Sequence, residues 1–249
     1  MASDNGFPPI IGTYNGINYY IRNGKQCQRK AGGGFTSESI KNNPKMQGIR
    51  DRNKEMTLCS KFTMNFKDAM SPFLKEIHDG TLHERLMKLF MKIRTFDETP
   101  EGKRTAGRGL KGDTGRKLLK EFKFTAGPDG WNILGPVVAF DPTTGTLNAA
   151  SFDPQRLKFP KGSTHFFLDY GVLEYDWKKD AFRLILNEGT LVVEKGDEAG
   201  ELMLEVPDKP KKGKLVFGVV KVRFYQKLRD KYYESGAKGG VGIGVVTNE

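Results

Sequence analysis

The feature that most constrains the fold is a pair of long β-type segments in the second half of the chain. They are THFFLDYGVLEYDW at residues 164–177 and KLVFGVVKVRFYQ at residues 214–226. Apolar side chains recur at every second position in both. Because successive side chains of a strand point to opposite faces, this alternation predicts strands with one face in a core. The positions expected to face inward are Phe166, Leu168, Tyr170, Val220, Val222 and Phe224.

Shorter segments of the same kind surround these two. Turn sequences such as Asp141-Pro142-Thr143-Thr144-Gly145 separate them. Short strands at spacings of about 8–12 residues are typical of an antiparallel sandwich or barrel. The expected strands are residues 131–140, 146–152, 164–176, 181–187, 190–195, 201–206, 214–226 and 241–247.

The first half of the chain has a different pattern. Residues 8–30 are rich in strand formers and contain Asn15-Gly16 and Asn23-Gly24, the strongest short signal of a β-hairpin. Residues 45–77 predict a long helix or a helix pair, in which Pro72 starts a new turn or kinks the helix. Residues 81–95 predict an amphipathic helix.

Two shorter stretches complete this half. In RKAGGGFTSESIKNNP, residues 29–44, we expect Thr36 or Ser37 to cap a short turn and Pro44 to open the next helix. Residues 101–122 contain glycine at positions 102, 107, 109, 112 and 115, interspersed with basic residues. Glycine costs about 1 kcal/mol per position in a helix interior. The stretch therefore predicts a flexible or extended basic loop that leads into a strand or short helix at Leu118.

These elements together predict an α+β fold. An N-terminal β-hairpin and helices, with a basic loop rich in Gly, Arg and Lys, would occupy residues 1–122. An antiparallel β-sandwich-like domain would follow in residues 123–249. No linker rich in Pro or Ser separates the two parts. The sequence is therefore also compatible with two parts that pack together as one unit.

Charge is distributed unevenly along the chain. Residues 1–120 hold 23 Lys and Arg against 12 Asp and Glu, which accounts for the whole net charge of +11. An excess of this kind predicts a basic part that meets nucleic acid, an acidic protein surface or a membrane surface. The alternative is a solvated basic face that only aids solubility.

The residues expected to bind a partner lie in the hairpin and in the basic loop. Tyr14, Tyr19 and Tyr20 stand beside the hairpin cations, as base-stacking aromatics do, although no sequence signature of a known nucleic-acid-binding motif is present. The candidate partner-binding residues are Arg22, Lys25, Arg29, Lys30, Lys103, Arg104, Arg108, Lys111, Arg116 and Lys117.

Catalytic and metal-binding patterns are missing from the sequence. His78 and His83 do not have the spacing of a helical metal pair, and His165 is more typical of a strand start with a satisfied ring. The Gly32-Gly33-Gly34 triplet lacks the spacing of a phosphate-binding loop, and no nucleophile motif occurs. We therefore expect no catalytic, cofactor-binding or metal-binding residue, and a protein that is not an enzyme.

The environment can also be predicted. Cys27 and Cys59 are expected to be free thiols, which favours a reducing compartment or an exterior that tolerates thiols. The N-terminal residues lack the basic segment and the apolar segment that make up a secretory signal. No run of 18 apolar residues, the length of a transmembrane helix, occurs in the sequence. We therefore expect a cytoplasmic protein that is not inserted in a membrane. If the protein self-assembles, it would form part of a larger particle or filament.

One stretch resembles a known group of sequences. KAGGGFTSESIKNNPKMQGIRDRNKEM is similar to a segment of an uncharacterised family of small proteins from Bacteroidota, and the two long β-type segments resemble the β half of that family. The resemblance implies the two-part layout and transfers no activity. The matching residues are Gly33, Gly34, Ile40, Pro44, Arg50, Asn53 and Glu55.

The sequence is compatible with three functions. The leading one is a non-enzymatic structural protein that self-assembles or scaffolds, with copies of itself as partners. The alternative is a nucleic-acid or ribonucleoprotein-binding protein that uses the basic half. A second alternative is a carbohydrate-binding or hydrolytic β-sandwich, since such folds carry many kinds of site.

Overall fold

A computed structural model describes residues 9–32, 36–77, 79–125, 134–135, 137–235 and 241–247. The chain forms two compact units, which divide between Arg50 and Asp51. Each unit is described by itself below. Gly33, Gly34 and His78, together with the first part of the strand expected at 131–140, lie outside the described residues.

The first unit contains a small antiparallel sheet. Its strands β1 (Gly12–Tyr14), β2 (Ile17–Arg22) and β3 (Lys25–Lys30) are joined by the two Asn-Gly turns. Asn15 and Gly16 have φ of 47° and 77°, and Asn23 and Gly24 have 51° and 73°. Positive φ at both central residues is the mark of a type I′ turn, which matches the twist of the strands. The hairpin prediction is confirmed, and the sheet has three strands because both turns form.

A helical segment follows within the same unit. Thr36 caps α1 (Ser37–Asn42) by accepting from the N–H of Ser39, and Pro44 opens the short helix η1 (Pro44–Met46), as predicted. The Arg50 guanidinium then donates to the carbonyl oxygens of Ile40 and Asn43, at 2.6 and 2.9 Å. The Ile40 carbonyl lies in the last turn of α1, where Pro44 has no N–H to offer it, and the Asn43 carbonyl also accepts from the N–H of Met46 at 3.0 Å. The boundary of the two units falls inside the next helix, α2 (Gln47–Ala69).

The helices of the second unit follow the apolar pattern of the sequence. After α2, Pro72 starts the short helix α3 (Ser71–Leu74), so the predicted break is confirmed. The amphipathic helix α4 (Leu82–Ile93) is followed by η2 (Arg94–Phe96). The side chains that α4 buries recur at steps of three and four residues. They are Leu82, Leu86, Phe90 and Ile93.

The flexible or extended loop predicted within residues 101–122 is wrong, whereas the short helix expected at Leu118 is present. This stretch contains two short helices, α5 (Ala106–Gly109) and α6 (Asp113–Lys120). Its glycines are contact sites: a Cβ on Gly107 would lie 2.1 Å from the Tyr175 hydroxyl oxygen, and one on Gly109 would lie 2.1 Å from the Ile93 carbonyl oxygen. The close approach of these segments requires residues without a Cβ, which outweighs the helix cost of glycine.

The larger sheet of the second unit has six strands. Its centre is the antiparallel pair β6 (His165–Asp176) and β10 (Leu215–Leu228). Next to β6 lie β7 (Ala181–Leu186) and β8 (Leu191–Glu194), and next to β10 lie β11 (Lys231–Glu234) and β12 (Val241–Val246). Seven of the expected strands are confirmed here or below within a few residues, whereas β11 is an additional strand that the sequence pattern does not predict.

A smaller antiparallel sheet has the order β4 (Val138–Asp141), β5 (Thr146–Phe152), β9 (Gly200–Leu204). The short helix η4 (Pro154–Arg156) follows β5. One apolar core lies between this sheet and the six-stranded sheet. It contains all the side chains expected to face inward, namely Phe166, Leu168, Tyr170, Val220, Val222 and Phe224.

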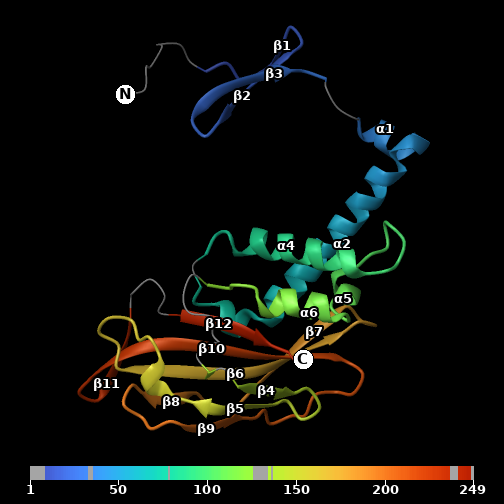
Figure 1. The fold of residues 1–249 in the computed structure, drawn as a ribbon. Helices are drawn as coiled ribbons and strands as arrows, with labels where there is room; N and C mark the ends of the chain where they lie inside the picture. Colours follow the sequence, from blue (N-terminus) through green and yellow to red (C-terminus); the bar gives the residue numbers. More distant parts are fainter. Residues whose placement is uncertain are drawn as a thin grey trace. The chain divides into compact units, whose positions relative to one another are not determined.

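The second unit therefore has three layers (Figure 1). Helices cover part of one face of the six-stranded sheet, and the small sheet packs on the opposite face. In the helical core, Phe62 of α2 makes edge contacts with Phe90 of α4 and Tyr175 of β6, with ring centroids 4.8 and 5.2 Å apart. The α+β fold with an antiparallel, sandwich-like β part is thus present, and helices from the first predicted domain share a core with strands from the second.

Candidate functional site

The predicted hairpin cations separate onto the two faces of the small sheet. The register pairs Arg22 with Lys25 and Asn18 with Arg29, so Arg22, Lys25 and Arg29 share one face with Tyr20. The guanidinium carbon of Arg29 lies 5.7 Å from the centre of the Tyr20 ring, a cation–π contact. Lys30 is on the opposite face. One face of this sheet therefore carries three cations around an aromatic ring.

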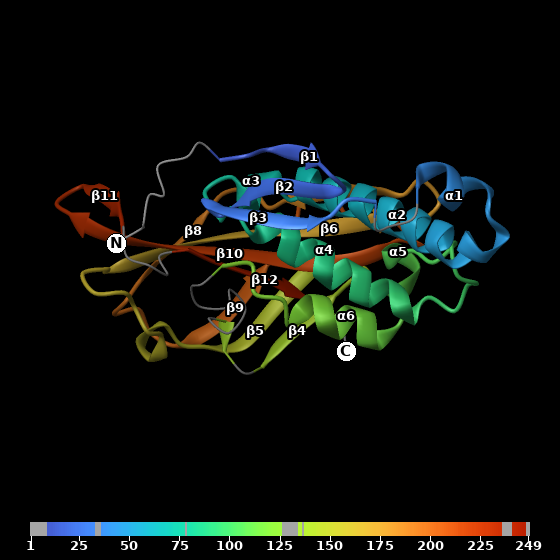
Figure 2. The same cartoon turned by 90° about the horizontal axis from the view of Figure 1, so that it is seen from above.

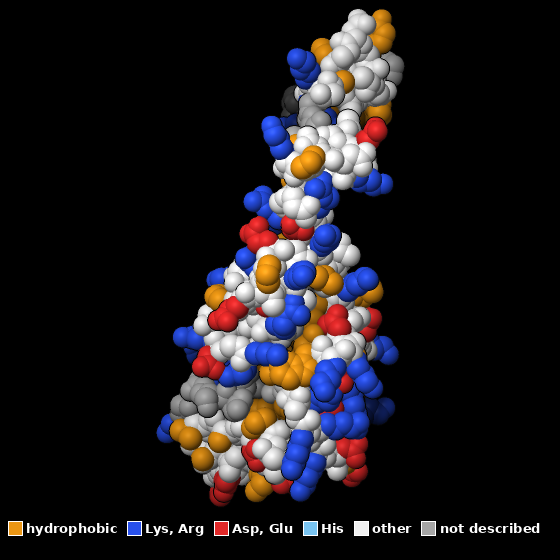
Figure 3. All heavy atoms as spheres, turned by 90° about the vertical axis from the view of Figure 1, so that its right-hand side faces the viewer, with side chains coloured by type: hydrophobic (Ala, Val, Ile, Leu, Met, Phe, Trp, Pro, Cys, Tyr) orange, Lys and Arg blue, Asp and Glu red, His pale blue; other side chains and the backbone are white. Residues whose placement is uncertain are grey.

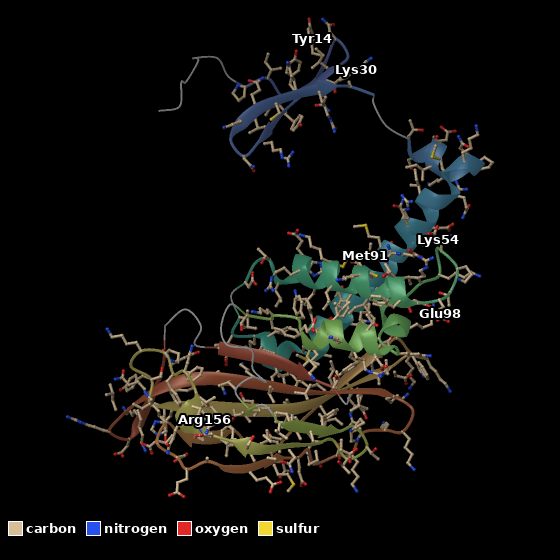
Figure 4. The ribbon with its side chains drawn as sticks, viewed as in Figure 1. Tyr14, Lys30, Lys54, Met91, Glu98 and Arg156 are labelled. Carbon is tan, nitrogen blue, oxygen red and sulfur yellow. The ribbon has the colours of Figure 1, made fainter. Side chains whose placement is uncertain are left out.

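The other face of the small sheet carries four apolar or aromatic side chains beside Gln26, Gln28 and Lys30. Tyr14 pairs with Ile17 and Ile17 with Lys30, so these three side chains share a face. Tyr19 and Ile21 belong to the same face, because they follow Ile17 at steps of two. Figure 4 shows Tyr14 and Lys30 at the same end of the sheet.

None of the described side chains in residues 9–50 is buried. Ile11 and Tyr14 are 70% and 69% exposed, and Ile10 and Ile21 are also largely open to solvent. Figure 3 shows hydrophobic side chains at the surface of this sheet beside lysine and arginine. A small sheet that buries no side chain has no hydrophobic core of its own to stabilise it.

Three of the predicted cations in residues 103–117 bond to acidic or carbonyl groups within the second unit. Arg108 donates to Asp97 at 2.8 Å, and Arg104 donates to the Thr99 carbonyl at 3.2 Å. Arg116 bonds to Asp113 and to the Lys111 carbonyl.

The remaining three cations of this segment are exposed. The Lys111 ammonium lies 3.1 Å from the centre of the Trp177 ring, and Lys103 and Lys117 reach solvent. Acidic and basic side chains are interspersed on the face drawn in Figure 3. The segment is thus tied down by ionic contacts and is not an open basic arm.

Asp97 organises the turn before α5. Its carboxylate accepts from the N–H groups of Thr99 and Thr105, at 3.1 and 2.7 Å, as well as from Arg108. Burial alone would raise the pKa of Asp97, but these donors outweigh burial and hold the pKa below its ordinary value. A second buried carboxylate, Glu55, pairs with Arg94 and accepts from the Gly102 N–H at 2.8 Å.

A second candidate surface lies on the helix-side face of the six-stranded sheet, at the end that carries β8 and β11. That end extends past the helices of residues 51–120 in Figures 1 and 2. The register brings Phe167, Tyr225 and Tyr232 together there: the ring centroids of Phe167 lie 4.2 Å from Tyr225 and 5.1 Å from Tyr232. We call these three side chains the aromatic row. Phe167 and Tyr225 are half-buried, and Tyr232 is exposed.

His165 and the nearby cations border the aromatic row. The His165 ring begins β6 and packs on Tyr232 at 5.3 Å, and its Nδ1 lies 2.8 Å from the Thr164 hydroxyl. The sequence interpretation of His165 as a satisfied strand-start residue is confirmed. Lys227 lies over the Tyr232 ring at 5.4 Å.

A network of charges adjoins the aromatic row where the helical layer begins. Lys221 is almost fully buried, and its Nζ lies 2.7 Å from a Glu76 carboxylate oxygen. Arg223 bridges Glu76, at 3.3 Å, and Asp169, at 2.9 Å. Two cations and two carboxylates are thus held together between the α3 segment and the sheet.

These contacts keep Glu76 ionised. Partial burial would raise the pKa of Glu76, but the hydrogen bond and charge of Lys221, with the charges of Arg223 and Lys75, lower it below its ordinary value. Coulomb attraction at these distances stabilises the carboxylate form.

A cavity of about 280 Å³ opens beside this network. Asp169 and Lys221 line it on the sheet, and the Thr190 hydroxyl donates to Asp169 at 2.5 Å. The rest of its lining is a mixture of apolar and polar groups, namely Pro72, Phe73, Tyr170, Leu186, Asn187 and Gly189.

An acidic segment begins at the last residue of β8 and continues through β9. Residues 194–205 contain five carboxylates and a single lysine, Lys195, and all six of these charged residues are exposed. The strand β9 within this segment is the outer strand of the small sheet. The carboxylates are Glu194, Asp197, Glu198, Glu201 and Glu205.

In the described parts of the chain, no group of three or more His, Cys, Asp or Glu side chains is placed to hold a metal ion. No helix in these ranges has the length and apolar character to cross a membrane. Comparison with models of protein families, with curated proteins and with solved structures finds no match to the chain.

Proposed function

We propose that this chain is a non-enzymatic structural protein that assembles with copies of itself through its N-terminal unit. The observation that carries the proposal is the small sheet of residues 12–30, in which no described side chain is buried. Folded units of fewer than about 40 residues usually need disulfides, metals or oligomerisation to be stable. The sheet gains stability when a partner covers it.

The apolar face supports a protein partner. Tyr14, Ile17, Tyr19 and Ile21 lie side by side on one face of the sheet. Removal of apolar surface from water favours association. Tyr14 and Ile21 are exposed, and exposed apolar side chains grouped on one face are typical of an interaction site.

Charge supports a second copy as that partner. The opposite face carries Arg22, Lys25 and Arg29, and residues 194–205 of another copy offer five exposed carboxylates. Complementary charge steers two surfaces together and fixes their orientation. A chain that carries both surfaces contains the elements that head-to-tail assembly requires.

The test uses the full chain and a matched control. The variant carries Arg22→Glu, Lys25→Glu and Arg29→Glu, which reverses the basic face. The control carries Lys61→Glu, Lys161→Glu and Lys212→Glu, which makes the same change of net charge at other exposed lysines. Light scattering after size exclusion should show oligomers for the wild type and the control, and a monomer for the basic-face variant.

The outcomes separate assembly from nucleic-acid binding. A wild-type monomer at all protein concentrations contradicts the proposal. If that monomer binds single-stranded RNA with an affinity that falls steeply with salt, the basic face is a nucleic-acid surface instead. Oligomers that persist after nuclease treatment exclude RNA as the bridge.

A further inference from the structure

The cavity beside Lys221 has the composition of a ligand site that is independent of assembly. Its most unusual group is the Lys221 side chain, which is 3% exposed. An ammonium group has three N–H donors. Among the described residues it has one partner, Glu76. Buried donors without acceptors are costly, so a ligand that supplies acceptor oxygens is stabilised here.

The charges of the cavity favour a neutral ligand. Lys221 donates and carries positive charge, whereas Asp169 accepts and carries negative charge, and both line the same cavity. The network beside the cavity holds two cations and two carboxylates, so its charges balance. It therefore attracts neither an anion nor a cation strongly. A hydroxyl group satisfies both Lys221 and Asp169, because it accepts from one and donates to the other. Asn187 also lines the cavity, and its side-chain amide can both donate and accept hydrogen bonds.

The aromatic row extends this cavity along the sheet. Phe167 lies on the same face as Asp169, two residues along β6, which corresponds to about 7 Å. Phe167 stacks on Tyr225 and meets Tyr232 at its edge. The negative face of an aromatic ring attracts the polarised C–H groups on one side of a sugar ring. Hydroxyl-binding groups next to aromatic rings therefore suit a sugar residue in the cavity and a second one on the row.

We propose that the cavity lined by Asp169, Asn187 and Lys221, together with the aromatic row, binds a neutral oligosaccharide. One sugar residue places its hydroxyls between Lys221 and Asp169. The next residue lies against Phe167 and Tyr225. The apolar part of the lining, from Pro72, Phe73 and Leu186, contacts the C–H groups of the buried sugar.

Isothermal titration calorimetry of the full chain tests this site. The probes are cellohexaose, laminarihexaose, maltohexaose, xylohexaose and chitohexaose, with inorganic phosphate and oligothymidylate as anionic comparisons. At least one hexasaccharide should saturate the wild-type protein, and neither anion should compete with it. If no hexasaccharide binds, or if an anion displaces a bound one, the proposal is overturned.

Two variants locate the site, each with a check of folding by thermal melting. Tyr232→Ala should weaken binding roughly tenfold, whereas Tyr233→Ala should leave it unchanged. These neighbours on β11 are exposed by 39% and 51% and point to opposite faces of the sheet, which makes them a matched pair. Asn187→Ala should also weaken binding. Equal affinity in the wild type, Tyr232→Ala and Asn187→Ala would place the sugar elsewhere and overturn the proposal, whatever the oligomeric state of the protein.

Discussion

The backbone of Gly115 in α6 lies against the carbonyl group of Gly109 in α5, where a Cβ would come within 2.2 Å of the carbonyl oxygen. Backbone atoms cannot turn aside as a flexible side chain does. The two short helices therefore approach as closely as they do because position 115 has no side chain.

Gly115→Ala should lower the free energy of unfolding by about 2 kcal/mol or more, because the packed segments must separate. Urea unfolding measures this. Gly112→Ala is the control, since the nearest atom to an added Cβ there is 3.9 Å away. Equal stability of the two variants would contradict the close contact of α5 and α6.

Acid should destabilise the second unit partly through Asp97. The pKa of this carboxyl is held below its ordinary value of 3.8 in the folded chain. The unfolded chain then binds its proton more readily, so the carboxylate stabilises the fold above about pH 4 and the contribution is lost as pH falls through the folded pKa.

Asp97→Asn should therefore remove part of the pH dependence of stability. Urea unfolding from neutral pH to below pH 4 should show a smaller loss in the variant than in the wild type. At neutral pH the variant should be less stable by about 2 kcal/mol, because it loses charge-assisted bonds in a buried site. Parallel pH profiles would mean that Asp97 has the same pKa in the folded and unfolded chains.

The buried ammonium of Lys221 depends on Glu76. Glu76→Gln should lower the free energy of unfolding by about 2 kcal/mol. The loss is moderate because the Glu76 side chain is 40% exposed. Adding Lys221→Met to that variant should recover much of the loss, since the unpaired charge is then gone. Additive losses in the double variant, measured by urea unfolding, would show that the two side chains do not act as a pair.

The two cysteines should differ sharply in reactivity. Both thiols are free, as predicted from the sequence; Cys59 is buried and Cys27 is half-buried. Burial raises the pKa of Cys59 to about 11, which removes the reactive thiolate at neutral pH. Iodoacetamide followed by mass spectrometry should label Cys27 in the native protein and both cysteines after unfolding. Rapid native labelling of Cys59 would contradict its burial.

Local sequence signals predicted the elements that depend on local chemistry. The Asn-Gly pairs at 15–16 and 23–24 specify type I′ turns, and both form. Alternation predicted the inner faces of β6 and β10 correctly. Pro72 and Pro44 start helical turns as expected, because a proline N–H is not needed there.

The features that sequence reasoning missed depend on contacts between distant segments. Glycines at 107, 109 and 115 were interpreted as loop residues, but each is required by a neighbour that the sequence does not reveal. The aromatic row was not found, since only the pairing of β6, β10 and β11 brings its members together. The sequence also does not reveal which basic residues already have an acidic partner within the fold. Arg108 is an example, because it is paired with Asp97.

Hydrogen exchange measures directly whether a partner covers the N-terminal sheet. A sheet without a buried side chain exchanges its amide protons quickly unless a partner covers it. Exchange followed by mass spectrometry should show that amides of residues 17–30 become protected as protein concentration rises, in step with the mass from light scattering. Protection that stays the same at every concentration, in a protein that remains monomeric, would contradict the account.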